Sequence, residues 1–184
     1  MRRSVEEAFS ALRDQVKNWK AGAAKPHVSV FVYPPEWEPA VLTRFHEFRE
    51  QCEAEANPIE LVDVGQGLLL EVEKREGLGK ALAEMEPEDS DGLIHNLGVV
   101  ASRYLKRALR EKPQSPVACR VLMNTGALAT FVSYSAIANE LAGAGDQEGQ
   151  VPVPCVLAFP GEGDERFLNL LRLRADTNYR TPRI

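Results

Sequence analysis

The sequence has no long apolar run, few cysteines and few histidines, and each absence excludes a class of protein. No stretch approaches the roughly 20 apolar residues that a membrane-spanning helix needs. The first residues lack the apolar core and cleavage site of a secretory signal, so we expect a cytoplasmic protein. The three histidines form no HxxxH or HExxH pair, so a zinc site is not expected. Three cysteines without CxxC spacing are expected to be buried, reduced thiols: Cys52, Cys119 and Cys155.

The charge balance gives the chain no overall attraction to a nucleic-acid backbone. The formal net charge is −5 at pH 7, so basic residues matter only where they gather locally. At 103–112 their helical spacing, opposite Leu105 and Leu109, favours a solvated helix face over a nucleic-acid patch. In the tail, a weak DNA contact stays open through four arginines: Arg172, Arg174, Arg180 and Arg183.

Apolar periodicity divides the 184 residues, which suit a single domain spanning 1–184, into alternating helices and strands. Amphipathic spacing predicts helices at 3–20, 36–55, 68–85, 91–111 and 133–143. Short β-branched or uniformly apolar runs predict buried strands at 28–34, 59–65, 117–128 and 151–161. The fourth strand is expected to end at a Pro160-Gly161 turn, and 167–174 fits an edge strand or a helix turn.

Strands separated by helices indicate βαβ crossovers, and therefore a three-layer α/β fold. We expect a mostly parallel sheet of about four to five strands with helices on both faces, Rossmann-like or like a degenerate P-loop fold without a Walker A motif. The carboxyl ends of parallel strands line the usual ligand crevice. Four segments are predicted to meet there: 33–35, 63–65, 124–126 and 159–162.

Motifs that would place chemistry at this crevice are incomplete. GLGK at 77–80 lacks the first glycine of a phosphate loop and the hydroxyl residue after its lysine. Gly65-Gln66-Gly67 lacks the third glycine of the dinucleotide motif, so a strand-to-helix turn is favoured. EVEK at 71–74 is out of register for a metal-dependent nuclease, GxSxG is absent, and the acids at 162–165 would repel phosphate. No active site follows from motifs.

The order of segments in the second half carries a resemblance to a family. VLMNTGALATFVSYSAIANEL (121–141) is followed by VPCVLAFPGEGDERFLNLLRL (153–173) and then by NYR (178–180). This succession resembles the BrxB family of bacteriophage exclusion (BREX) defence systems. The matching positions are Thr125, Gly126, Asn139, Leu141, Phe159, Pro160, Gly161, Glu162, Asn178, Tyr179 and Arg180. The N-terminal half matches in layout: a leading amphipathic helix, a strand ending in Tyr-Pro, and a strand with Asp63.

The resemblance implies a cytoplasmic, non-enzymatic accessory component of a multi-gene phage-resistance system that methylates host DNA. It implies binding to the PglZ-type alkaline-phosphatase-domain protein of that system, and contacts with other BREX components. No catalytic residue, metal or cofactor is expected. The candidate crevice or partner-binding residues are Asp63, Thr125, Gly126, Phe159, Pro160, Gly161, Glu162, Asn178, Tyr179 and Arg180.

A second hypothesis is a nucleotide- or metal-binding enzyme or sensor with an unconventional site at the carboxyl ends of the strands. It would use Asp63, Thr125 and Glu162, with Arg180 brought across from the tail. Clustered carboxylates of this kind would have perturbed pKa values.

Overall fold

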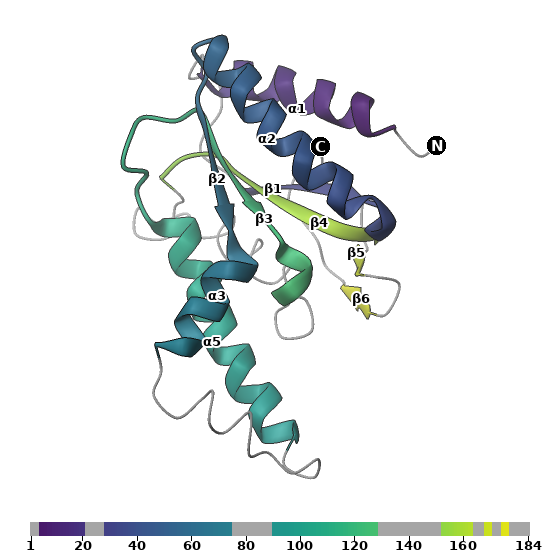
Figure 1. Ribbon diagram of the computed structural model, residues 1–184, viewed down its shortest axis with the longest axis vertical. Helices are drawn as coiled ribbons and strands as arrows, with labels where there is room; N and C mark the ends of the chain where they lie inside the picture. The colour runs from purple at the N-terminus through teal and green to yellow at the C-terminus, as the bar shows by residue number, and fades with distance from the viewer. Residues whose placement is uncertain are drawn as a thin grey trace.

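The computed structural model describes residues 4–20, 28–74, 90–128, 152–163, 168–170 and 174–176 (Figure 1). The helices are α1 (Val5–Lys20), α2 (Glu38–Ala54), α3 (Val64–Glu73) and α5 (Ser90–Arg110), with short 3-10 turns η1 (Pro35–Trp37) and η3 (Thr125–Leu128). The strands are β1 (Val28–Tyr33), β2 (Ile59–Asp63), β3 (Cys119–Met123), β4 (Cys155–Gly163), β5 (Leu168–Leu170) and β6 (Arg174–Asp176). The predicted helix at 133–143 and the second half of that at 68–85 lie outside the described residues.

Four parallel strands form the sheet in the order β2-β3-β4-β1. β4 is central: Leu157 lies opposite Val30 of β1 on one side and Leu122 of β3 on the other. Helices cover both faces, which confirms the expected three-layer, mostly parallel α/β fold. No helix in the described part of the chain is long and apolar enough to cross a membrane.

The prediction that the fourth strand ends at Pro160-Gly161 is wrong. β4 continues to Gly163, and Gly161 pairs with Leu170 of the antiparallel β5. The stretch at 167–174 supplies β5 and the start of β6 instead of one edge element. Proline is tolerated in β4 because β3 pairs with it only as far as Leu157, so Pro160 needs no N–H on that side.

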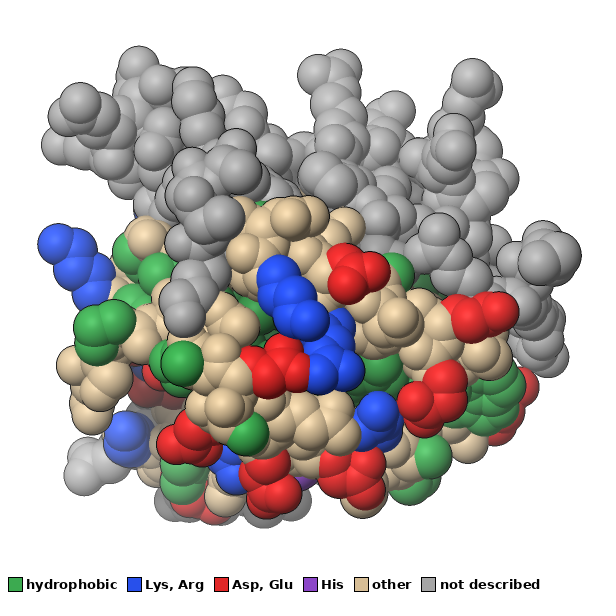
Figure 2. All heavy atoms as spheres, turned by 90° about the horizontal axis from the view of Figure 1, so that it is seen from above, with side chains coloured by type: hydrophobic (Ala, Val, Ile, Leu, Met, Phe, Trp, Pro, Cys, Tyr) green, Lys and Arg blue, Asp and Glu red, His purple; other side chains and the backbone are tan. Residues whose placement is uncertain are grey.

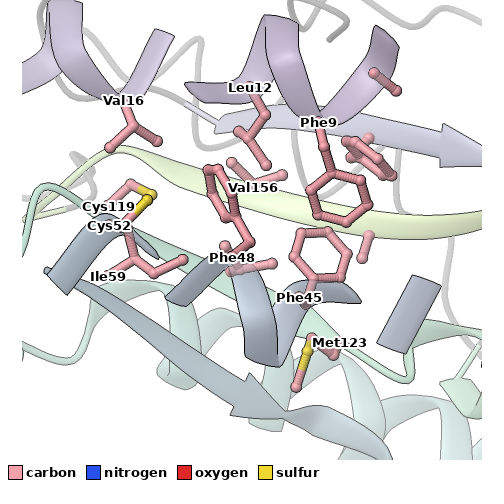
Figure 3. Packing of buried hydrophobic residues seen from close by; sticks show 14 of the residues in the cluster. Phe9, Leu12, Val16, Phe45, Phe48, Cys52, Ile59, Cys119, Met123 and Val156 are labelled. Carbon is pink, nitrogen blue, oxygen red and sulfur yellow. The ribbon is translucent and has the colours of Figure 1, made fainter. Parts of the chain in front are cut away.

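One face of the sheet is packed by α1 and α2 through a cluster of aromatic rings (Figure 3). The Phe9 ring centroid lies 5.0 Å from that of Phe31, 4.9 Å from that of Phe45 and 5.6 Å from that of Phe48. Such tilted and edge-on contacts stabilise beyond simple area burial. The other face packs α3 and α5, with Leu105 and other fully buried residues, against the remaining strand side chains.

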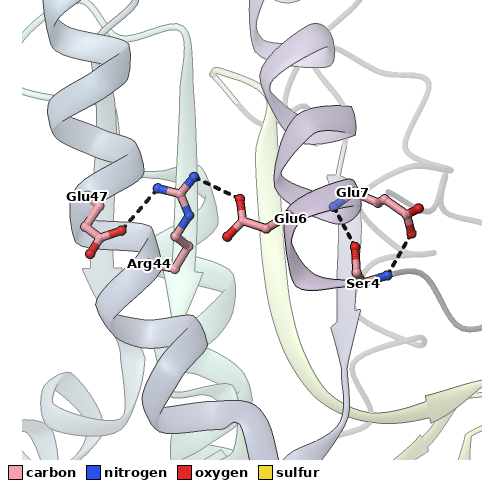
Figure 4. Close-up of polar contacts among 5 residues, drawn as sticks. All are labelled: Ser4, Glu6, Glu7, Arg44 and Glu47. Atoms are coloured by element: carbon pink, nitrogen blue, oxygen red, sulfur yellow. Dashed lines mark hydrogen bonds and ion pairs between the residues drawn. The ribbon is translucent and has the colours of Figure 1, made fainter.

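Polar contacts hold α1 at its place on α2 (Figure 4). Ser4 and Glu7 form a reciprocal capping box, with Glu7 N–H donating to Ser4 Oγ at 3.2 Å and Ser4 N–H to Glu7 Oε2 at 2.8 Å. Arg44 of α2 bridges Glu6 of α1 at 3.3 Å and Glu47 at 3.1 Å. The N-terminal helix is therefore tied to α2 by an ion pair and to the sheet by apolar contacts.

A buried arginine at the amino end of the sheet holds α5 against β3. Arg120 donates from Nε and Nη2 to Glu60 Oε2 of β2, each at 2.8 Å. Its Nη1 donates to the carbonyl oxygens of Ala108 and Glu111, the latter at 2.7 Å. A cation at a helix C-terminus satisfies carbonyls that have no partner within the helix. This residue therefore serves the fold, at the end of the sheet opposite the carboxyl ends of the strands.

Candidate functional site

Asp63 joins β2, α3 and β3 at the carboxyl end of the sheet. Its Oδ1 accepts from Gln66 N–H at 2.8 Å, which caps α3, and its Oδ2 accepts from Asn124 Nδ2 at 2.6 Å. Asn124 has a positive φ of 56°, a conformation that asparagine tolerates better than most residues. Both carboxylate oxygens are therefore engaged within the protein, and the positive end of α3 already carries an anion.

Thr125 and Gly126, which follow β3 in the chain, contact β4 through a hydrogen bond and through close packing. The buried Thr125 hydroxyl donates to the Ala158 carbonyl oxygen. A Cβ built on Gly126 would lie 3.0 Å from Pro160 Cγ and 3.6 and 3.7 Å from the two carboxylate oxygens of Glu38. A larger residue here would make ordinary contact with the Glu38 carboxylate but would press on the proline ring, which would have to shift by a few tenths of an ångström.

The Phe-Pro-Gly-Glu segment lies beside these residues as continuous strand. Phe159 is buried in the core, and Pro160 lies opposite Tyr33, the last residue of β1. Gly161 and Glu162 already pair with β5. The backbone of Glu162 is placed, but its side chain is outside the described part of the structure.

Glu38 is a residue of the site that motif reasoning missed. It begins α2, is half-buried, and accepts from the Tyr33 hydroxyl at 3.3 Å. Burial raises the pKa of the Glu38 carboxyl, although the Tyr33 hydrogen bond opposes this. Burial, together with the charge and hydrogen bond of Glu38, also raises the pKa of Tyr33. The only signal in the sequence was an acid shortly after the Tyr-Pro end of the first strand.

A second tyrosine packs against the start of α3, where a glycine turn was predicted. Gly65 and Gly67 belong to the first turns of α3, and the hydroxyl of Tyr104 from α5 occupies the position that a Gly67 side chain would need. Arg107 lies 5.5 Å over the Tyr104 ring and pairs with Glu71 at 2.6 Å. Burial raises the pKa of Tyr104, and the cation of Arg107 opposes this. Gly67 therefore allows close helix packing.

The structure brings together some predicted site residues and leaves others untested. Asp63, Thr125, Gly126, Phe159, Pro160 and Gly161 gather at the carboxyl ends of the strands, as expected. Asn178, Tyr179 and Arg180 lie outside the described residues, so the proposed approach of Arg180 remains a prediction. The same holds for the tail arginines, except that Arg174 is placed in β6 by its backbone.

Metal and thiol chemistry find no support among the described residues. No group of three or more His, Cys, Asp or Glu side chains in those ranges could hold a metal ion. All three cysteines are buried and unpaired, which confirms their predicted burial. Burial raises the pKa of each thiol, that of Cys155 to about 12. Neutral thiols of this kind are poor nucleophiles.

The outer face of α1 and α2 carries both signs of charge. Figure 2 shows Lys and Arg side chains interspersed with Asp and Glu across the described part of this face. Several are paired there, including Arg13 and Lys17 with Glu55. On α5, Leu105 and Leu109 are buried while Arg103, Arg107 and Arg110 are exposed, which confirms the predicted solvated face at 103–112.

The strand ends thus present satisfied polar groups around one half-buried carboxyl, that of Glu38. Comparison with protein-family models, with curated proteins and with solved structures finds no match to this chain. The resemblance to BrxB therefore depends on the residues quoted for it, and the function has to be argued from the fold and from the residues at the carboxyl ends of the strands.

Proposed function

We propose that this chain is a non-enzymatic accessory component of a cytoplasmic BREX phage-resistance system, where it binds the PglZ-type alkaline-phosphatase-domain protein. The succession from Thr125-Gly126 through Phe159-Pro160-Gly161-Glu162 to Asn178-Tyr179-Arg180 supports the family. The observation that favours an interaction module is that the polar residues at the carboxyl ends of the strands bind one another. The hydrogen bonds of Asp63 and Thr125 cap α3 and tie β3 to β2 and β4, and neither joins a nucleophile to a general base.

Asp63 is the clearest case of a polar group at the strand ends whose position disfavours nucleotide binding. Phosphates bind at helix N-termini because unpaired N–H groups and the helix dipole attract anions. At α3 that position is taken by the Asp63 carboxylate, which accepts from Gln66 N–H. A nucleotide phosphate would therefore meet a negative charge instead of free donors, and this favours a binding module over a nucleotide enzyme.

The test is co-expression of the chain with the phosphatase-domain protein encoded beside it. We expect a complex that survives affinity and size-exclusion chromatography at micromolar concentration. A chain that elutes alone, although folded by circular dichroism, would argue strongly against the proposal. Deletion of its gene from a system that also encodes a methyltransferase should abolish phage resistance, and the intact gene should restore it.

The second hypothesis, a nucleotide- or metal-binding enzyme or sensor, keeps one favourable observation. Glu38 is a half-buried carboxyl with a raised pKa at the strand ends, which is a common property of functional acids. A thermal shift with ATP and magnesium, retained in Thr43→Ala but lost in Glu38→Gln and Asp63→Asn, would support it. Asp63→Asn keeps an oxygen to accept from Gln66, so a lost shift would report ligand binding instead of a lost helix cap. No shift with any nucleotide would remove the main support of this hypothesis.

A further inference from the structure

The two edges of the parallel sheet differ in accessibility. In β1, five of six residues are buried, whereas in β2 only Ile59 is buried and the next four residues are partly exposed. Among the described residues, β2 pairs with β3 alone. An edge strand directs alternate N–H and C=O groups away from the sheet, where they can pair with another strand. β2 therefore presents an open edge.

This edge lacks the usual protection against pairing. Proteins guard exposed edges with lysine, proline, bulges or outward charges. β2 contains neither lysine nor proline, and its two acids have internal partners. Glu60 pairs with Arg120, and Asp63 accepts from Gln66 and Asn124. The charge of Glu60 is thus paired with a cation, while Asp63 keeps its charge with both oxygens bonded to donors within the protein.

Below the edge, α3 presents an apolar side. Leu69 and Leu70 are 64% and 48% exposed. Gly67 and Glu71 face α5, since they meet Tyr104 and Arg107. With about 100° per residue, Leu69 lies roughly 160° round the helix from both. It therefore points away from α5 and, at this exposure, towards solvent.

Above the edge, α2 presents a charged side that is complementary to itself. α2 packs on β2. Arg44 within α2 and Glu55 just after it face α1, where they pair with Glu6 and Arg13. Helical geometry places Arg49 roughly 140° from Arg44, and so on the side of α2 away from α1. Glu53, one turn further along, shares this side. Both are exposed, and neither forms an ion pair with another described residue. Figure 1 shows α2 and α3 on either side of β2.

We propose that a second copy of this chain covers this flank, through antiparallel pairing of β2 with β2 about a two-fold axis. Centred on Leu61, the pairing sets Leu61 against Leu61, Glu60 against Val62 and Ile59 against Asp63, so no like charges face each other. The two-fold axis brings the Leu69 sides of α3 together and Arg49 of one α2 towards Glu53 of the other. The two sheets become one, and both edges of β2 are paired. This assembly requires no phosphatase-domain protein and is independent of the proposed function.

The test is the mass of the isolated full chain by size-exclusion chromatography with light scattering, across micromolar concentrations. We expect twice the chain mass of 20.4 kDa. Leu69→Glu/Leu70→Glu should weaken the dimer at least tenfold, and Thr43→Glu, on the solvent side of α2, should leave it unchanged. Arg49→Glu should also weaken it, and Arg49→Glu/Glu53→Arg should restore it, since the opposite charges are exchanged.

Two results would overturn the proposal. One is a wild-type chain that stays monomeric throughout the concentration series. The other is a dimer that persists in both the leucine and the charge variants. If the leucine variant fails to fold, the charge exchange decides alone, because exposed residues of opposite sign leave the core intact. Amide hydrogen exchange gives a separate readout: β2 amides should be protected in wild type and should exchange faster in Arg49→Glu.

Discussion

Replacing Arg120 by methionine is the most informative single perturbation of the fold. Methionine keeps most of the apolar volume of the side chain and removes the guanidinium. The Arg120 side chain is only 3% exposed, and it bonds to Glu60 and to the carbonyl oxygens of Ala108 and Glu111. The change therefore removes the cap of α5 and the tie between β2 and β3 at one time.

The expected loss in the free energy of unfolding depends on whether each bonding partner of Arg120 can reach water after the change. Removing one member of a buried ion pair costs roughly 3–5 kcal/mol when the other stays buried. The Glu60 side chain is 33% exposed, so it can regain water, and Glu111 is exposed as well. The buried Ala108 carbonyl has no such access, and leaving it unpaired costs roughly 1–3 kcal/mol. We therefore expect a loss of about 3 kcal/mol, at the lower end of the ion-pair range.

Chemical denaturation of Arg120→Met, Glu60→Gln and the double variant measures these contributions. The free energy of unfolding should fall by about 3 kcal/mol in Arg120→Met and by about 1 kcal/mol in Glu60→Gln. The double variant should lose less than the sum, because the two residues share one contact. Arg120→Lys should be less stable than wild type but more stable than Arg120→Met, since one ammonium cannot bond to both Glu60 and the helix end. A loss below about 1 kcal/mol in Arg120→Met, or strict additivity, would refute this account of the buried pair.

Two substitutions and one thiol-reactivity experiment test other contacts. Glu38→Gln keeps an acceptor for the Tyr33 hydroxyl but cannot ionise. Because the pKa of Glu38 is raised in the folded state, the wild-type protein should lose stability as the pH rises from the unfolded-state pKa through the folded-state pKa. Urea melts across that pH range should show a smaller loss in the variant. Gly67→Ala should cost about 1 kcal/mol net, since overpacking against Tyr104 exceeds the gain in helix propensity, and it should become neutral or stabilising with Tyr104→Leu. The cysteines should react with a thiol reagent only as fast as the chain unfolds, and rapid reaction in native buffer would contradict their burial.

The layers of the fold could be predicted because apolar pattern and element order determine them. Val28 to Tyr33 and Cys119 to Met123 are nearly uniform apolar runs, and both proved to be buried parallel strands. The course of β4 could not be predicted, because a Pro-Gly pair ordinarily indicates a turn. Pro160 remains in the strand since β3 has already ended beside it, and this depends on tertiary neighbours.

The candidate site could be predicted in position but not in chemistry. Strand ends located Asp63, Thr125 and Gly126, because parallel strands bring their carboxyl ends to one edge of a sheet. Their hydrogen bonds to Asn124 and Ala158 join residues that are distant in the sequence, and no local pattern reports them. Glu38 was missed because its contacts with the Tyr33 hydroxyl and with Gly126 appear only in the folded structure.

The central position of β4 has a consequence for how the chain acquires its structure during synthesis. β4 lies between β1 and β3, so those two strands have no neighbour in common until it arrives. Val28 pairs with Cys155, a separation of 127 residues, and such distant contacts slow folding. The nascent chain therefore carries an incomplete sheet and exposed strand edges until β4 leaves the ribosome, and unpaired edges of this kind are prone to aggregation.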